Sequence, residues 1–479
     1  MRTQRPSAES LSQPDAARST IGSWPSLTCL ADQADPAVAR TSPGRSAVLA
    51  AAVARLSRSS SPEAARQPIE PTIATLPAQP AAVSEAVASQ VLQQRNKPTV
   101  QRFRRRGRRR KMLSEPAKGG QIAVIVPAHN EAAGIERTLV SLLAQSLRPA
   151  RLIVVSDNSA DPTPNLVRKY AGRGVEVVRT VNNNSRKAGA LNTGIRWLCK
   201  GQGSLPAGIQ YVFTMDADTE LDRQFLEKAA RYMDRHPEAG AVSAACRGRA
   251  TPIVTGDGWQ RVMKRPFLKW LVMMQHIEYD RVAYTRALSH VHTMSGAGSL
   301  IRAKALNSLL TDRDAFDPRP DNLVEDFELT VELKQRGWKV TANEHLIAYT
   351  DLMPTLGMLL RQRQRWVRGT ADELRRRGWT KATWYSKLLM LWGALAMPVF
   401  YMMMAHWVSV MLRIGIAPRS LVVPISVCLV YSWAVRHLGW RYILLEALFF
   451  PELAYGIIRY YWFISALLES RFSSRRSWA

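Results

Sequence analysis

The sequence predicts an α/β domain with a mostly parallel sheet, followed by transmembrane helices near the carboxyl end. From Gln121 onward, short apolar runs alternate with helical periods, which is typical of parallel strands joined by helices. After Leu388 the chain contains long apolar runs that a soluble domain would not bury. We therefore expect a mostly disordered basic arm over residues 1–117, the α/β domain with an interfacial helix over 118–383, and two or three membrane spans over 384–479.

The composition narrows the possible partners without choosing among them. The 479 residues include 66 Lys and Arg against 38 Asp and Glu, a net charge of +28. This charge suits nucleic acid, an anionic membrane surface or a phosphorylated substrate. The 4 cysteines are scattered singly, so the spacing predicts neither a zinc site nor a disulfide framework, and a reducing compartment fits. The first apolar stretch, residues 47–54, is too short to span a bilayer or to act as a secretory signal, so we expect a cytoplasmic amino terminus.

The arm is rich in Ala, Ser, Pro, Gln and Arg, a composition that cannot bury enough apolar surface to fold. It ends in a basic run over residues 102–111. Three interpretations stay open for this run: solvated charge, attraction to anionic lipid headgroups, and nucleic-acid binding. The membrane region further along favours lipid, and we regard nucleic acid as an unlikely partner.

Four apolar runs predict strands of the α/β domain. They cover residues 122–128, 152–157, 175–179 and 211–218. A helical stretch over 133–145 follows the first, with Ile135, Leu139 and Leu142 on one face, and a second helix is expected around 166–170. Ligands of such sheets bind beyond the carboxyl ends of the strands.

Three apolar runs predict the membrane region. They cover residues 388–412, 421–435 and 442–468. We expect the first two to span, whereas Glu446, Pro451 and Glu452 interrupt the third, which is expected to kink or re-enter. Three spans would place the basic tail after residue 470 outside, against the positive-inside tendency.

Carboxylates follow the second and fourth predicted strands. Asp157 can accept hydrogen bonds from a ligand, or it can cap a helix or turn. Asp216 and Asp218 form a D-x-D turn whose hard oxygen atoms suit Mg²⁺ or Mn²⁺ bridging a diphosphate, although such turns also occur without a metal. Glu325 and Asp326 open a predicted helix, where acidic residues also occur simply as partners of the helix dipole.

Two further patterns have ordinary interpretations. The helix around residues 356–368 alternates apolar side chains with arginines, as a membrane-surface helix does. His129, His276, His290 and His292 have no metal-ligand spacing, so we expect them to be ordinary polar residues.

Seven segments occur in an order that resembles family 2 glycosyltransferases of the GT-A fold. They read VPAHNEAAGIERTLVSLLAQS, VVSDNSAD, RKAGALNTGI, TMDADT, SGAGSLIR, VEDFELT and QRQRW. The resemblance covers residues 122–366 and is closest to the processive branch that contains the cellulose, chitin and hyaluronan synthases. It implies a nucleotide-sugar donor, with a UDP-sugar favoured.

By this resemblance, Asn130, Glu131 and Asp157 surround the nucleoside, with Asp157 near the base. Lys187 approaches the nucleotide or its phosphates. Asp216 lies near the ribose and diphosphate and takes part in the metal site.

The resemblance also assigns Asp218 to direct coordination of Mg²⁺ or Mn²⁺ and Asp326, with Glu325 beside it, to the catalytic base. An inverting transfer needs one carboxylate to take the proton of the attacking hydroxyl. Val324 stands where the family usually has Thr.

Gln362, Arg365 and Trp366 match the family's Q-x-x-R-W pattern on an interfacial helix. Arg365 can pair with the diphosphate and Trp366 can stack against an acceptor sugar. Gly296 permits a close backbone approach near the acceptor.

The sequence therefore predicts a multi-pass cell-membrane enzyme with a cytoplasmic catalytic domain. It would transfer a sugar from a nucleotide-sugar to a hydroxyl of a glycan acceptor, with inversion and possible processivity. The alternatives are single-sugar transfer to a lipid, protein or cell-wall acceptor, and a non-enzymatic basic adaptor for membrane or nucleic acid. The sugar, the acceptor and the oligomeric state stay open.

Overall fold

The computed structural model describes residues 121–249, 265–288, 291–415, 421–448 and 450–472. All of them fall within one contact-defined unit, Ser84–Ala479. The expected arm over 1–117 with its basic run, His290, and the tail beyond Phe472 lie outside the described residues. What the sequence predicts for those segments stays a prediction.

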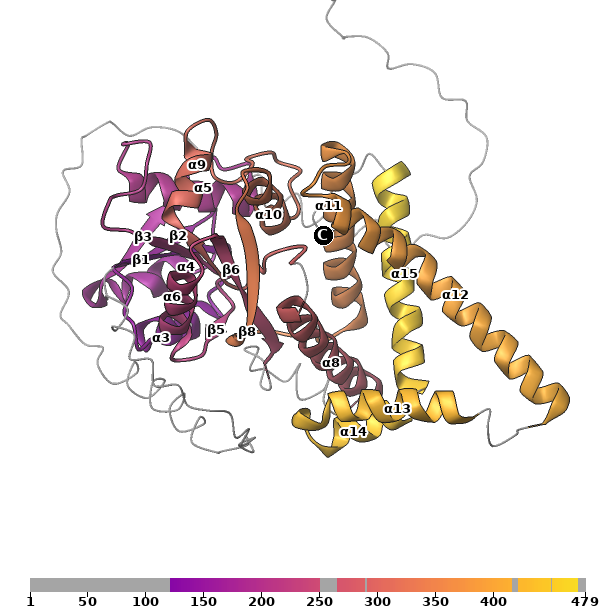
Figure 1. Cartoon of the computed structure of the whole chain (residues 1–479). Coiled ribbons are helices and arrows are strands. Elements are labelled where there is room, and N and C mark those ends of the chain that lie inside the picture. Colours follow the sequence, from indigo (N-terminus) through magenta and orange to yellow (C-terminus); the bar gives the residue numbers. More distant parts are fainter. Residues whose placement is uncertain (1–120, 250–264, 289–290, 416–420, 449, 473–479) are drawn as a thin grey trace, which may run out of the picture. The chain divides into compact units, whose positions relative to one another are not determined.

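An eight-stranded sheet organises the described α/β domain (Figure 1), with strand order β3-β2-β1-β4-β7-β6-β8-β5. The strands are β1 (Ile122–Ala128), β2 (Arg151–Ser156), β3 (Val175–Arg179), β4 (Tyr211–Thr214), β5 (Glu220–Leu221), β6 (Ala239–Gly248), β7 (Ser299–Arg302) and β8 (Lys339–Thr350). The first four agree with the strands that the sequence predicts, except that β4 ends at Thr214 and not at residue 218, and they pair in parallel.

The other half of the sheet corrects the prediction of a mostly parallel sheet. β7 is antiparallel to both β4 and β6, β5 is antiparallel to β8, and only β6 and β8 add a further parallel pair. The sheet is therefore mixed. The repeats at the amino-terminal end predict parallel pairing, whereas a four-residue strand such as β7, which reads SLIR, carries no local signal for the direction in which it pairs.

Helices cover both faces of the sheet (Figure 1). The described helices of this domain are α3 (Ile135–Leu143), α4 (Thr163–Arg168), η1 (Ala171–Arg173), α5 (Arg186–Cys199), α6 (Phe225–Arg235), α9 (Ala303–Leu310) and α10 (Glu325–Gln335). In β1, Val124 and Val126 pack with the α3 and α6 side, whereas Ala123 and Ile125 pack with α5, α9 and α10. Burial on both faces explains why this strand is continuously apolar.

The remaining described helices include the apolar helices near the carboxyl end. They are α8 (Pro266–Leu288), α11 (Leu356–Arg377), α12 (Trp384–Ile414), α13 (Val422–Ala434), η3 (Arg436–Leu438), α14 (Trp440–Ala447) and α15 (Phe450–Phe472). Leu271 and Ile277 of α8, Leu359 of α11, and Tyr455 and Trp462 of α15 share one buried apolar cluster. This cluster attaches α11 and α15 to the α/β domain through α8.

Among the described residues, one helix is long and apolar enough to cross a membrane, the stretch Trp384–Arg413 of α12. It corresponds to the first expected span. With 13 residues, α13 is shorter than the roughly 20 residues a bilayer requires, and α15 carries Glu452 and Arg459. The second and third spans therefore stay predictions.

The interrupted third run is two helices with a break between Ala447 and Phe450. Its carboxylates pair with α8: the Arg281 guanidinium lies 2.7 Å from Glu446 and 2.7 Å from Glu452. Glu446 is only 1% exposed. These acidic residues thus join α14 and α15 to α8 through a shared arginine.

Candidate active site

Most of the residues singled out in the sequence meet in one cavity of about 860 Å³. It lies where the parallel strands β1, β2 and β4 end, and residues of α8, α10, α11, α12 and α15 complete its wall. The lining includes Glu131, Asp157, Lys187, Asp216, Asp218, Gly296, Glu325, Asp326, Gln362, Arg365 and Trp366. Segments more than 200 residues apart in the chain therefore contribute to a single site.

Asn130 is the exception, because it does not line this cavity. It has a left-handed backbone conformation with φ of 55°, and its Oδ1 accepts a hydrogen bond from the Ala160 backbone N–H at 2.9 Å. The side chain thereby ties the loop after β1 to the loop after β2. The neighbouring His129 lines the cavity instead, and its Nδ1 lies 2.6 Å from the Asp157 carbonyl oxygen.

The Asp157 carboxylate is held firmly at the end of β2. Its Oδ1 accepts hydrogen bonds from Thr180 Oγ1 and Asn183 Nδ2, both at 2.8 Å. Asn183 also donates to the Arg186 carbonyl oxygen at 2.7 Å. The sequence analysis gave no role to Arg186, the first residue of the RKAGALN segment, or to Asn183, which lies three residues before it.

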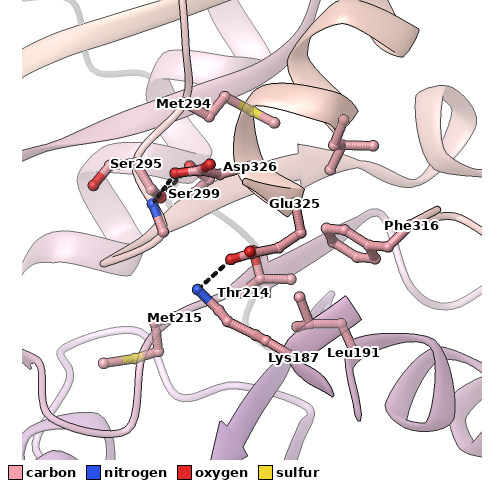
Figure 2. Close-up of a pocket in the computed structure, with 12 residues that line it drawn as sticks. Lys187, Leu191, Thr214, Met215, Met294, Ser295, Ser299, Phe316, Glu325 and Asp326 are labelled. Carbon is pink, nitrogen blue, oxygen red and sulfur yellow. Dashed lines mark hydrogen bonds and ion pairs between the residues drawn. The ribbon is translucent and has the colours of Figure 1, made fainter. Parts of the chain in front are cut away.

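Lys187, in the first turn of α5, occupies the centre of the site (Figure 2). Its Nζ lies 2.6 Å from Asp216 Oδ1 and 2.5 Å from Glu325 Oε1. Burial by itself lowers the pKa of Lys187, but Asp216, Glu325 and Asp326 together outweigh burial and raise it, so the amine stays protonated. One cation therefore links the D-x-D turn to the start of α10.

Gly296 brings the backbone against this charged cluster. Its N–H donates to Asp326 Oδ2 at 3.2 Å, a hydrogen bond drawn in Figure 2. A Cβ at this position would lie 2.9 Å from Lys187 Nζ, 3.4 Å from Asp216 Oδ2 and 3.6 Å from Asp326 Oδ2. Glycine is required here because a side chain would displace the lysine from its two carboxylates.

Asp326 and Glu325 have different environments at the start of α10. Desolvation, then repulsion from Glu325, raises the pKa of Asp326 to about 6, and Lys187 partly offsets this effect. Glu325 is engaged by Lys187, whereas Asp326 accepts from the backbone N–H groups of Gly296 and Phe327. A carboxyl group with a pKa near 6 is a stronger base than usual and is still mostly ionised at neutral pH.

Three carboxyl groups face one another across the donor side of the cavity. Desolvation, then Asp218 and Asp216, raise the pKa of Glu131 to about 8, and desolvation, then Asp216 and Asp351, raise that of Asp218 to about 6. A divalent cation would relieve this repulsion. The described part of the chain contains no group of three or more His, Cys, Asp or Glu side chains arranged to hold a metal alone. The donor set fits Mg²⁺ or Mn²⁺ bound by one or two carboxylates together with diphosphate and water oxygens.

Positively charged side chains also line the cavity. Arg365 on α11 and Arg186 at the start of α5 both line the cavity. Burial lowers the pKa of Arg186, and repulsion from the positive charge of Arg365 lowers it further. A paired arginine arrangement suits a ligand with adjacent phosphate groups.

Val324, which stands where the resembled family usually has Thr, affects how α10 begins and packs. Val324 is the N-cap of α10 and makes no side-chain capping bond. Its methyl groups approach Gly369 of α11 so closely that a Cβ there would lie 2.8 Å from Val324 Cγ1. In this chain the capping hydroxyl is replaced by apolar packing between α10 and α11.

A buried ionic network also joins α10 to α11, and the sequence reasoning missed it. Glu328, which is fully buried, lies 2.9 Å from Arg313 and 3.0 Å from Arg377. Arg377 also pairs with Glu373 on α11. Glu328 stands two residues after Asp326, so the network holds the helix turn that presents the carboxyl group with raised pKa.

Residues 123–310 match the model of the family described as glycosyl transferase family 2. A poly-beta-1,6-N-acetyl-D-glucosamine synthase of Staphylococcus aureus (strain COL) is 26% identical over 260 residues, covering 53% of this chain and 56% of that protein. The enzyme of the same name from Staphylococcus epidermidis is 25% identical over 268 residues, covering 54% and 57%. The chain thus spans little more than half the length of the curated relatives it matches.

A solved mannosyltransferase of Pyrobaculum calidifontis, in complex with GDP-Man and Mn²⁺, is 17% identical and covers 82% of this chain and 95% of that one, with a TM-score of 0.49. That likeness is too weak to add to the fold assignment. The family match covers strands β1 to β7 and the motifs around Lys187, the D-x-D turn and Gly296. Over residues 123–310 the α/β domain therefore resembles glycosyl transferase family 2, and its sheet is mixed.

Proposed function

We propose that this chain is a membrane-bound, inverting glycosyltransferase that moves a sugar from a nucleotide-sugar to a hydroxyl of a glycan, with processive polysaccharide synthesis as the favoured mode. The observation that carries the proposal is the cluster around Gly296. There Lys187, Asp216 and Asp326, from three separate motifs, all lie within 3.6 Å of one Cβ position. The groups proposed to bind the donor, Lys187 and Asp216, thus lie close enough to the proposed base, Asp326, for all three to act at the same anomeric carbon.

On the donor side, Asp157 and Glu131 would contact the nucleoside, with Asn130 shaping the loop behind them. Arg365, Arg186 and Lys187 would neutralise the diphosphate. Asp218 and Asp216 would hold Mg²⁺ or Mn²⁺, which supplies positive charge to the departing diphosphate. A UDP-sugar is the proposed donor, and N-acetylglucosamine is the first sugar to test because the two relatives are named as synthases of its polymer.

On the acceptor side, Asp326 is the proposed base. The acceptor hydroxyl oxygen attacks the anomeric carbon, its proton passes to the Asp326 carboxylate, and the bond between that carbon and the diphosphate oxygen breaks on the opposite face. Glu325 is less suited to take the proton because Lys187 occupies it. Trp366, beside Gln362 on α11, would stack against the acceptor sugar.

One observation favours the alternative of transfer to a lipid-linked acceptor. Val282, Leu389, Met390 and Phe463 line an apolar part of the same cavity, and two of them belong to the membrane-compatible helix α12. Whichever acceptor applies, we propose a cytoplasmic catalytic domain over 118–383 and a membrane-embedded region over 384–479, with further spans beyond α12.

The experiment is an assay of the full chain in detergent with a panel of nucleotide-sugars, following nucleoside diphosphate release with Mg²⁺ or Mn²⁺. We expect turnover with one donor and loss of turnover in excess chelator. A folded protein that releases no diphosphate from any donor would refute the transferase. Deleting residues 1–117 distinguishes the transferase from the adaptor alternative, since a transferase keeps its turnover without the arm.

A further inference from the structure

A buried ion pair lies directly behind the proposed acceptor-stacking residue. Arg363 is 4% exposed, and its Nε and Nη2 lie 3.3 Å from the Oε1 and Oε2 atoms of Glu278 on α8. Its guanidinium carbon lies 4.4 Å from the ring centre of Trp366 and 5.1 Å from that of Tyr279. The flat cation is therefore in contact with two aromatic rings while its charge is matched by one carboxylate.

The ion pair is held in turn by α15. The Tyr455 hydroxyl donates to Glu278 Oε2 at 2.5 Å. Tyr455 is 1% exposed, and Trp270 and Trp462 meet its ring edge to face. A continuous chain of contacts thus runs from Tyr455 through Glu278 and Arg363 to Trp366, although Tyr455 itself does not line the cavity.

This arrangement restricts how Trp366 can move. Rotating Arg363 away from its position would leave the partly buried Glu278 carboxylate, whose side chain is 19% exposed, without its charged partner, which is unfavourable. The Trp366 ring therefore has a fixed backing on one side, while its side chain is still 37% exposed. A rigid aromatic surface loses little entropy when a sugar stacks on it.

We infer that Tyr455, Glu278 and Arg363 are positioning residues that hold Trp366 in the orientation that binds the acceptor, so that Tyr455 of α15 acts on acceptor affinity although it does not line the cavity itself. The inference rests on the proposed function. It concerns acceptor binding only, because neither Tyr455 nor Arg363 contacts the carboxylates of the donor side.

The test compares Tyr455→Phe and Arg363→Lys with a matched control in the full detergent-purified chain. Tyr455→Phe removes one hydroxyl and keeps the ring, and Arg363→Lys keeps the charge but loses the flat group that stacks. The control is Ser465→Ala, which removes a different hydrogen bond between α11 and α15, from Gln364 Nε2 to Ser465 Oγ at 2.7 Å. The acceptor probe is a β-1,6-linked N-acetylglucosamine oligosaccharide, and thermal unfolding verifies that each variant is folded.

We expect the acceptor KM to rise about tenfold in Tyr455→Phe and in Arg363→Lys, the size of one hydrogen bond to a charged group. The donor KM and the slow diphosphate release without acceptor should stay unchanged, and Ser465→Ala should match the wild type. Equal acceptor KM values in Tyr455→Phe and wild type would overturn the inference alone. An equal rise in Ser465→Ala would also overturn it, because general packing of α11 against α15 would then suffice. A wild-type chain without turnover would instead refute the proposed function and the inference with it.

Discussion

The proposed donor and acceptor sides of the cavity are built in different ways. On the donor side, Glu131, Asp157 and Asp218 follow the ends of adjacent parallel strands, so the backbone of the sheet positions them. On the acceptor side, Trp366 depends on side-chain contacts between helices that are distant in the chain, such as Arg363 with Glu278, 85 residues away. Substitutions on the donor side should therefore change the charge of the site while the backbone positions stay the same. Substitutions on the acceptor side should instead change how the side chains of the site are positioned.

The largest expected effect is at the junction of the two sides. Asp326→Asn keeps the size of the side chain but removes the carboxylate that accepts the proton, so kcat should fall by ~10²-fold or more. Nucleoside diphosphate affinity, measured by calorimetry, should barely change because the base acts on the acceptor hydroxyl. If Glu325→Gln is inactive while Asp326→Asn turns over normally, the base is Glu325, which pairs with Lys187, and Asp326 is not the base.

A donor-side effect of about 10- to 100-fold is expected for Asp218→Asn, a size typical of weakening a metal site. Calorimetry should show weaker binding of nucleoside diphosphate in the presence of Mn²⁺. In excess chelator, wild type and variant should bind equally, because no cation is left for the carboxylate to hold. A variant that retains Mn²⁺-dependent binding would remove Asp218 from the metal site.

Gly296→Ala should lower kcat by about tenfold while leaving the fold intact. The new Cβ would lie 2.9 Å from Lys187 Nζ, so the amine must leave Asp216 or Glu325. The nearest atom ends a flexible side chain, and the melting temperature should therefore change little. The matched control is Gly172→Ala, where a Cβ would meet nothing within 4 Å and activity should be unchanged. Full activity in Gly296→Ala would show that the Lys187 contacts are dispensable.

The smallest effect concerns pH. Because desolvation raises the pKa of Asp326 to about 6, the base is lost as pH falls through that value, not near pH 4. We expect kcat to be about half its plateau at pH 6 and to fall about tenfold for each further pH unit. The same raised pKa means that keeping Asp326 ionised costs folding stability, a cost present at neutral pH and lost as pH falls below about 6. A kcat that is flat down to pH 5 would contradict Asp326 as the base.

The sequence predicts the residues of the donor side better than those of the acceptor side. The sequence indicated Asp157, Asp216 and Asp218 because an apolar strand followed by a carboxylate is a local pattern. It did not indicate Glu278, Arg363 or Tyr455 as a set, since no local pattern links residues that meet only after α8, α11 and α15 pack together. Lys187, Asp216 and Glu325 were each predicted as site residues, but the pairing of Lys187 with both carboxylates was not, because the three residues come from different motifs.

The sequence by itself determined the first four strands, the α/β class, and an apolar helix over Trp384–Arg413. Hydrophobic period and length are properties of contiguous residues, so they can be recognised before the chain folds. Only the tertiary structure decided that the sheet is mixed and that Gly296 lies against Lys187. Strand direction, buried ion pairs and close backbone approach depend on which distant segments meet, and that choice is made by the packing of the whole domain.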